Sequence, residues 1–269
     1  MKVYITGHAG YVGQELLKRG FLPLVCNITQ WESVERAIQK TKPDLLIHLA
    51  GKSDVDFCED RLNQEEVILS NVRGTNNVFQ SLKQLRLPGV FMSTDQIWRG
   101  GWFEGHHEYS KRTPPVNFYG MSKVSAEAVV SYAGGNIIRT SYLFDKKRLE
   151  NRIQNMKTGV KEYYPTFITR SFMHLYDFCD LLEIYCQRFY EMPKVLHLSG
   201  STTASWYRFM KDVENRYGVK GSVKPRFFNK SGFAPRPYYG GLNTNLSFGL
   251  GFPPRNYFDG IDRMRRYES

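Results

Sequence analysis

The sequence lacks the features that mark disulfide-stabilised, secreted and membrane-spanning proteins. Its four cysteines are scattered with no CxxC pair, so we expect reduced core thiols in a cytoplasmic protein. No apolar run approaches the length that spans a bilayer. The opening MKVYITGHAG has no charged stretch followed by an apolar one, so we expect no signal peptide and no membrane partner.

Acidic residues are few compared with basic ones. The 26 Asp and Glu against 37 Lys and Arg give a formal charge of +11 over 269 residues, which favours anionic partners. The basic residues are spread along the chain, whereas nucleic-acid binders often concentrate them in a run or stripe, so we expect no nucleic-acid partner. Two interpretations stay open: a solvated basic surface, and a basic rim that draws in a substrate with a diphosphate.

Short apolar runs alternate with segments of helical period from the first residues onward, in a chain that is 41% hydrophobic and so able to form a core. The pattern predicts strands at 2–6, 22–26, 44–50, 89–94 and 136–141. It predicts helices at 11–19, 31–40, 58–85 and 118–133. This alternation is typical of a parallel, doubly wound α/β sheet, and nearly continuous apolar strands indicate helices on both faces.

The rhythm loosens after about residue 145. The pattern there predicts two helices and a strand, at 174–189, 206–217 and 195–199. The stretch 220–255 is rich in Gly, Pro, Asn and aromatic residues, and we expect it to form a small lobe over the sheet. The predicted division is a dinucleotide-binding region at 1–145, with later segments contributing, and a mainly substrate-binding lobe at 146–269.

Three glycines lie between the first predicted strand and helix, in GHAGYVG at 7–13. Glycine lets the backbone approach a phosphate closely, and a helix that begins there points N–H groups and partial positive charge at the anion. The spacing is G-x-x-G-x-x-G rather than the G-x-G-x-x-G of the dinucleotide fingerprint. Its place in the α/β pattern predicts a pyrophosphate cradle, and the alternative is a structural tight turn.

No residue stands where the adenosine ribose is usually held. An Asp or Glu is expected about 20 residues after the glycine loop, at the end of the second strand. That strand ends in CNIT at 26–29, and the next two acids belong to the following helix. Only one predicted strand separates the glycine loop from 44–50, where a nucleotide-binding half usually has two. We infer that a strand and its helix are missing, and the preference between NAD and NADP stays open.

A tyrosine and a lysine four residues apart, Tyr119 and Lys123, lie in PVNFYGMSKVSAE. On a helix the two side chains share one face. A free phenol has a pKa of about 10, and a nearby ammonium lowers it by stabilising the phenolate. The block STD at 93–95 ends the preceding strand, at the edge where such sheets bind ligands. Glycine loop, strand-end hydroxyls and pair in this order predict proton transfer beside a dinucleotide.

Seven blocks carry a family resemblance over nearly the whole chain: GHAGYVG, PDLLIHLAGKSDVDFCE, STDQIWRGG, PPVNFYGMSKVSAE, IIRTSYLF, VLHLSGSTTASW and FAPRPYYGGLNTNL. By them the chain resembles the extended short-chain dehydrogenase/reductase superfamily, and within it the dTDP-4-dehydrorhamnose reductase (RmlD-like) family. The resemblance implies a Rossmann-like fold, a bound NAD or NADP, and reduction of the C4 ketone of a nucleotide-linked 4-keto-6-deoxy sugar. It leaves room for a homodimer.

The resemblance also implies roles for single residues. Tyr119 would protonate the nascent alkoxide, Lys123 would orient the nicotinamide ribose and tune Tyr119, and Thr94 would hydrogen-bond the ketone oxygen. Cofactor contacts are implied for Gly7, Gly10, Tyr11, Val12, Asn27, Ala50, Gly51, Tyr119 and Lys123. Thr140 and Ser141 would lie near the nicotinamide. Substrate contacts are implied for Ser93, Asp95 and Gln96, and for Arg236, which would reach the diphosphate.

Some positions depart from the family pattern. Gln96 stands where the family usually has Tyr, and Asn27 stands where members often have an Asp that faces the adenine. Two other functions stay open: a nucleotide-sugar C4 epimerase that keeps its cofactor bound, and a non-catalytic regulatory or scaffolding subunit. The missing strand and ribose reader motivate the second. His106 and His107 have no third ligand at a suitable spacing, so we predict loop residues and no metal.

Overall fold

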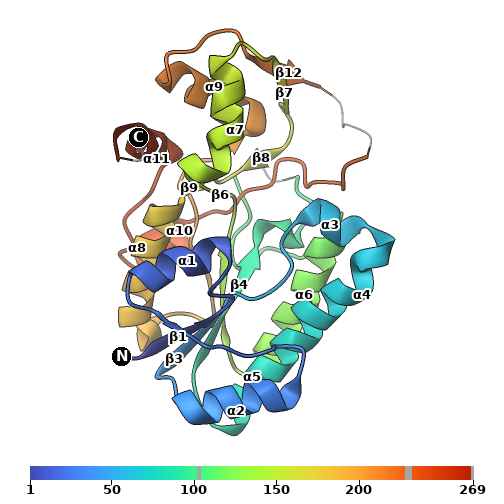
Figure 1. The fold of residues 1–269 in the computed structure, drawn as a ribbon, viewed down its shortest axis with the longest axis vertical. Helices are drawn as coiled ribbons and strands as arrows, with labels where there is room; N and C mark the ends of the chain where they lie inside the picture. The colour runs from blue at the N-terminus through green and yellow to red at the C-terminus, as the bar shows by residue number, and fades with distance from the viewer. Residues whose placement is uncertain (102–103, 228–231, 268–269) are drawn as a thin grey trace.

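The protein is built around a six-stranded sheet in which all neighbouring strands are parallel (Figure 1). The structure is a computed structural model that describes residues 1–101, 104–227 and 232–267. The strands are β1 (Val3–Thr6), β2 (Leu22–Pro23), β3 (Leu45–His48), β4 (Gly89–Thr94), β5 (Asn136–Thr140) and β10 (Val195–His197), in the order β10-β5-β4-β3-β1-β2. The predicted parallel α/β fold is confirmed.

Helices cover both faces of this sheet. One face carries α2 (Trp31–Thr41), α5 (Thr75–Gln84) and α6 (Phe118–Tyr132). The other carries α1 (Tyr11–Lys18) and α8 (Leu175–Gln187). Strand β3 supplies both cores: Leu45 and Ile47 pack beneath α8, and Leu46 packs beneath α2, because successive side chains of a strand point to opposite faces.

The sheet ends at β2, on the side where a ribose reader is usually found. β2 is two residues long and pairs only with β1 within the described sheet. Pro23 has no N–H to donate and so suits an edge strand. The chain then runs through α2 to β3 on the far side of β1, so one strand fills the place of two. The predicted loss of a strand is confirmed within residues 1–101.

The prediction of a single helix over 58–85 is wrong. The segment forms α3 (Val55–Glu59), the 3₁₀ turn η1 (Arg61–Asn63), α4 (Gln64–Val67), the π-helical η2 (Ile68–Gly74) and α5. Asp54 caps α3 by accepting from the N–H groups of Asp56 and Phe57. Asp60 accepts from the Leu62 N–H in the next turn. These carboxylates compete for backbone donors and divide the segment.

The remaining elements form a C-terminal lobe above the sheet (Figure 1). They are α7 (Lys146–Lys157), α9 (Trp206–Arg216), α11 (Tyr257–Tyr267), and the strand pairs β7 (Glu162–Pro165) with β12 (Val223–Arg226), β8 (Thr169–Arg170) with β11 (Ala204–Ser205), and β6 (Leu143–Phe144) with β9 (Met173–His174). The lobe has its own apolar core, in which Phe172 stacks on Phe209 with ring centroids 4.0 Å apart.

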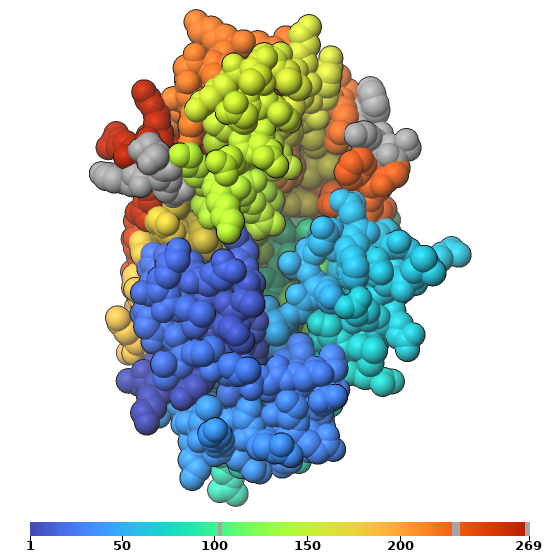
Figure 2. All heavy atoms as spheres, in the orientation of Figure 1, coloured from blue at the N-terminus to red at the C-terminus, as the bar shows by residue number. Residues whose placement is uncertain are grey.

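The second half of the chain also returns to the sheet. It supplies β10, α8, the short helix α10 (Asn245–Gly249) and the turn η4 (Phe189–Glu191) to that part of the molecule. None of the helices in the described ranges is both long enough and apolar enough to cross a membrane. Figure 2 shows a hollow between the region of α1 and that of α3, below the lobe helix α7.

Candidate active site

The glycine loop joins β1 to α1 at the carboxyl edge of the sheet. Gly7 has a φ of 69°, and a Cβ there would lie 2.7 Å from the Ala50 backbone nitrogen after β3. A Cβ at Gly13 would lie 2.3 Å from the Gly7 carbonyl oxygen. Any larger residue at either position would displace the loop. The close backbone approach that a phosphate cradle requires is therefore built into this loop.

The N-terminus of α1 keeps its first backbone donors free of side-chain caps. Gly10 is the residue before the helix and has no side chain to accept a hydrogen bond, and the first turn of α1 carries no acid. Uncapped N–H groups and the partial positive charge of the helix fit a pyrophosphate. The predicted contacts Gly7, Gly10, Tyr11 and Val12 all line the cleft beside it.

A buried hydrogen-bond chain fixes the backbone where β3 ends. The Ala50 N–H donates to the Thr6 hydroxyl at 3.2 Å, and that hydroxyl lies 2.7 Å from His48 Nδ1. On the other side, His48 Nε2 lies 3.1 Å from the Thr75 hydroxyl, which donates to the Asn71 carbonyl at 2.7 Å. Burial lowers the pKa of His48 to about 3, so a neutral imidazole links the two threonines.

Asn71 lies in the π-helical η2, a distortion often found at functional sites. Its side chain holds the backbone of Lys52 twice: Oδ1 accepts from the Lys52 N–H at 2.7 Å, and Nδ2 donates to the Lys52 carbonyl at 2.9 Å. Nδ2 also donates to the Ser122 hydroxyl on α6 at 3.0 Å. Asn71 thereby ties the loop after β3 to the helix turn that carries Lys123.

Strand β4 leads the block at 93–95 into the short turn η3 (Asp95–Ile97). The Thr94 hydroxyl accepts from the Gln96 N–H at 3.3 Å. The Ser93 hydroxyl donates to the buried carboxylate of Glu127 at 2.6 Å. Ser93 lines the cleft, but its hydroxyl is therefore engaged by α6. Thr94, which also lines the cleft, neighbours the phenol of Tyr119.

Helix α6 carries Tyr119 to the floor of the cleft. The helix begins after Asn117, whose side-chain oxygen accepts from the Gly120 N–H at 2.7 Å. Tyr119 is 8% exposed, and burial raises its pKa, while the Thr94 hydroxyl opposes that rise. The sequence predicts a lowered pKa, and this prediction is wrong for the structure as it stands, because the loss of hydration outweighs the stabilising contacts.

Lys123 lies one helical turn beyond Tyr119. Its Nζ is 4.1 Å from the centroid of the Phe91 ring, a cation–π contact. Burial lowers the pKa of Lys123 to about 8. The ammonium makes no hydrogen bond to Tyr119 within the described part of the chain. Lys123 and Tyr119 nevertheless line the same cleft.

The cleft has a volume of about 640 Å³ and gathers most of the predicted site. It is lined by Gly7, Gly10, Tyr11, Val12, Gly51, Ser93, Thr94, Asp95, Gln96, Tyr119, Lys123, Thr140, Ser141 and Arg236. Two predicted cofactor contacts, Ala50 and Asn27, do not line it. Ala50 instead donates its N–H to Thr6, so it shapes the cleft from behind.

Asn27 is exposed beyond the end of β2. Its side-chain oxygen accepts from the Thr29 N–H at 3.1 Å and from the Thr29 hydroxyl at 2.8 Å. This local turn uses the acceptor that an adenine amino group would need. The acids that line the cleft are Asp54, Asp56 and Asp95, and none of them comes from β2, so the described cleft has no ribose reader at that strand end.

Arg236 and Gln96 line the substrate side of the cleft. Arg236 Nη2 donates to the Asp56 carboxylate on α3 at 3.0 Å, and Nη1 donates to the Ala234 carbonyl at 2.7 Å. The Gln96 side-chain oxygen accepts from Asn117 at 2.8 Å. The protein therefore holds both side chains in place on this wall.

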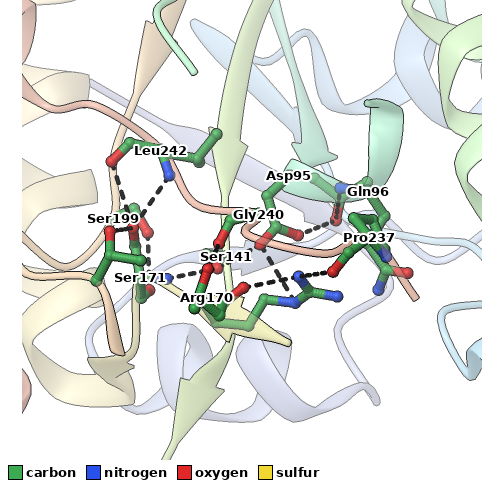
Figure 3. Close-up of polar contacts among 12 residues, drawn as sticks. Asp95, Gln96, Ser141, Arg170, Ser171, Ser199, Pro237, Gly240 and Leu242 are labelled. Atoms are coloured by element: carbon green, nitrogen blue, oxygen red, sulfur yellow. Dashed lines mark hydrogen bonds and ion pairs between the residues drawn. The ribbon is translucent and has the colours of Figure 1, made fainter. Parts of the chain in front are cut away.

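Asp95 is 3% exposed and is held by other side chains (Figure 3). Its Oδ2 accepts from the Ser141 hydroxyl at 2.5 Å and lies 3.5 Å from Arg170 Nε. Its Oδ1 accepts from the Thr94 hydroxyl at 3.3 Å. The sequence predicts a substrate contact for Asp95, whereas in this structure its oxygens contact groups of the protein.

Four residues that line the cleft were missed from the sequence: Arg148, Arg152, Arg170 and Trp206. The Arg148 guanidinium carbon lies 4.8 Å from the Tyr11 ring and 4.7 Å from the Tyr142 ring, and that of Arg152 lies 5.5 Å from the Trp206 ring. Arg148 and Arg152 are four apart on α7, a spacing that places both on one helix face and was visible in the sequence.

The predicted loop residue His106 has a structural place. It is fully buried and stacks on Trp98 with ring centroids 4.4 Å apart. Its N–H donates to the Gly241 carbonyl at 2.9 Å, and its carbonyl accepts from the Asn243 N–H at 2.8 Å. It does not line the cleft, and joins the loop after β4 to the loop before α10.

The arrangement suits hydride transfer coupled to protonation. A glycine cradle and an uncapped helix N-terminus lie on one side, and a buried phenol with a neighbouring hydroxyl and ammonium lies on the other. A phenol can deliver a proton to an oxygen that gains charge as hydride reaches its carbon. Arginines along the same walls fit phosphate groups.

Comparisons with known proteins agree with this geometry. The family model described as "RmlD substrate binding domain" matches residues 1–267. The spore coat polysaccharide biosynthesis protein SpsK of Bacillus subtilis is 24% identical, over 97% of this chain and 95% of its own. A dTDP-4-dehydrorhamnose reductase of Sinorhizobium fredii is 25% identical, over 81% and 78%. The crystal structure of dTDP-4-dehydrorhamnose reductase from Bacillus anthracis in complex with NADP superposes with a TM-score of 0.88 at 25% identity, over 98% and 99%.

Proposed function

Because this chain belongs to the RmlD substrate-binding domain family, we propose that it reduces the C4 ketone of a nucleotide-linked 4-keto-6-deoxy sugar with NADH or NADPH. The observation that carries the proposal is the meeting of Thr94, Tyr119 and Lys123 in one cleft with the glycine loop. Relatives named dTDP-4-dehydrorhamnose reductase support the same substrate class. When bound, the nicotinamide cofactor supplies the hydride.

The chain's own residues supply binding and the proton. The glycine loop and the N-terminus of α1 hold the pyrophosphate of the cofactor. The Thr94 hydroxyl holds the ketone oxygen, and the Tyr119 phenol delivers its proton to that oxygen. The Lys123 ammonium binds the ribose and stabilises the phenolate that remains. Burial of Tyr119 keeps water from competing for the proton.

Tyr119→Phe tests the proton donor. We expect turnover to fall by about a hundredfold or more, the usual scale of general acid catalysis, while the Kd for NADPH changes little. The assay follows the absorbance of the reduced nicotinamide with a panel of dTDP-, UDP- and GDP-linked keto sugars and both cofactors. Tyr132→Phe is the matched control, because Tyr132 lies on the same helix and is 75% exposed. Full activity of Tyr119→Phe would refute the assigned acid.

A non-catalytic regulatory or scaffolding subunit is the second candidate function. The short edge of the sheet and the lack of an acid after β2 favour it, because both weaken the usual hold on the adenosine ribose. Calorimetric titration with NADH and with NADPH separates the two candidates. Binding of neither cofactor would favour the subunit.

A C4 epimerase differs from the reductase in stoichiometry. A reductase consumes one reduced nicotinamide for each product, whereas an epimerase that keeps its cofactor consumes none. The homodimer and the cytoplasmic location stay predictions. Light scattering coupled to size-exclusion chromatography tests the first, and cell fractionation tests the second.

A further inference from the structure

Arg170 is a buried cation that the proposed reaction does not use. It ends β8, is 4% exposed and still lines the cleft. Burial lowers the pKa of its guanidinium, and Asp95 opposes that change. A guanidinium out of water needs an acceptor for each of its donors.

Two of its three nitrogens are occupied by the protein (Figure 3). Nε faces Asp95 Oδ2 at 3.5 Å, and Nη1 donates to the carbonyls of Thr169 at 2.9 Å and Pro237 at 3.3 Å. These contacts come from the end of β4, from β8 and from the loop before α10, so the fork is fixed from three sides. Nη2 has no hydrogen-bond partner among the residues that the structure describes.

The position of this fork relates it to the reacting end of a ligand. Its partner Asp95 follows Thr94 directly and accepts from the Thr94 hydroxyl at 3.3 Å. Asp95 also accepts from Ser141, so the same carboxylate joins Arg170 to two hydroxyls that line the cleft. Arg170 is therefore one side chain away from the oxygen that Thr94 holds in the proposed reaction.

The charge of the pair indicates the kind of acceptor. Asp95 balances Arg170, so the pair offers directed N–H donors without a net positive charge. Arg148 and Arg152 have no carboxylate in ion-pair contact among the described residues and line the same cleft, and they are better suited to phosphates. A neutral pair of this kind suits the hydroxyl oxygens of a sugar.

We propose that Arg170 is a specificity-determining residue whose Nη2 donates to a hydroxyl of the hexose, with Asp95 as the positioning residue that fixes the fork. This inference rests on the proposed function, which names the hexose as part of the substrate. Ligands without the hexose then gain nothing from Arg170. The nucleotide and diphosphate are bound elsewhere along the cleft.

Calorimetric binding of dTDP and of dTDP-rhamnose to the full chain tests the assignment. In Arg170→Lys, a single ammonium replaces the fork, and we expect the Kd for dTDP-rhamnose to rise about three- to tenfold, the scale of one lost hydrogen bond, with the Kd for dTDP unchanged. Arg208→Lys is the matched control, because its side chain is 67% exposed and lies outside the cleft.

A second variant covers the case in which Arg170→Lys does not fold, which circular dichroism would show. The double substitution Asp95→Asn with Arg170→Gln removes both buried charges, and we expect the same selective loss of affinity for dTDP-rhamnose. Equal weakening of both ligands would assign Arg170 to the diphosphate and overturn the inference, as would unchanged binding of both. A wild-type chain that binds dTDP-rhamnose no better than dTDP would instead contradict the proposed function, and the inference with it.

Discussion

Lys123 shows how a side chain's surroundings set its chemistry. It is buried between α6 and β4, with its Nζ above the Phe91 ring, and it has no carboxylate in ion-pair contact within the described residues. Burial lowers its pKa from 10.5 to about 8. Because the unfolded chain binds the proton more tightly, this group lowers folding stability below pH 8, and the loss is relieved as pH rises from about 8 to 10.5.

The same shift predicts a pH-dependent affinity for NADH. If the protonated ammonium binds the ribose, the Kd stays constant below pH 8 and rises above it, by up to about tenfold per pH unit. Fluorescence titration of NADH between pH 6.5 and 9.5 measures this. Lys123→Met is the control, and we expect weaker binding with no break near pH 8. A wild-type Kd that is flat over the whole range would contradict the role of Lys123.

At the scale of elements, the site depends on close contact between backbones. The glycine loop touches the end of β3 at Gly7 and its own helix at Gly13, and Asn71 in η2 holds the loop that follows Gly51. Each contact is to backbone atoms, which cannot move aside as a flexible side chain can. Strand ends and helix starts therefore keep one relative position.

Gly13→Ala tests this packing. Its Cβ would lie 2.3 Å from the Gly7 carbonyl oxygen and 2.7 Å from the His8 Cα, so the loop must shift away from the pyrophosphate position. We expect the Kd for NADPH to rise at least about tenfold, which corresponds to about 1.4 kcal/mol. Gly249→Ala in α10 is the control, because a Cβ there meets nothing within 4 Å. Equal cofactor affinity in the two variants would show that the loop does not hold the phosphate.

At the scale of the whole molecule, the cleft lies where sheet and lobe meet. Loops join the two: Gly100 bridges to Tyr238, and His106 bridges to Leu242. The ion pair between Asp95 and Arg170 adds a buried link. The cleft walls thus come from both halves of the chain, and a ligand that fills the cleft contacts both at once.

Cofactor binding is therefore expected to stabilise the entire fold. At a free NADPH concentration of one hundred times the Kd, linkage adds about 2.7 kcal/mol, which for a chain of this size raises the Tm by roughly 5–10 °C. Differential scanning fluorimetry with NADPH and NADH measures the shift. Gly13→Ala should show a smaller shift at the same concentration. The absence of a shift with either cofactor would favour the non-catalytic subunit.

The sequence by itself determined the parallel sheet, the missing strand, the glycine loop and the Thr94, Tyr119 and Lys123 set, because these follow from local periodicity and from spacing within one element. It did not determine the division of 58–85, which side-chain caps at Asp54 and Asp60 decide. Only the tertiary structure brought Arg170 to Asp95, 75 positions apart, and directed the Ser93 hydroxyl away toward Glu127. The pKa of Tyr119 was likewise a tertiary outcome, because the burial that raises it comes from packing that no local pattern encodes.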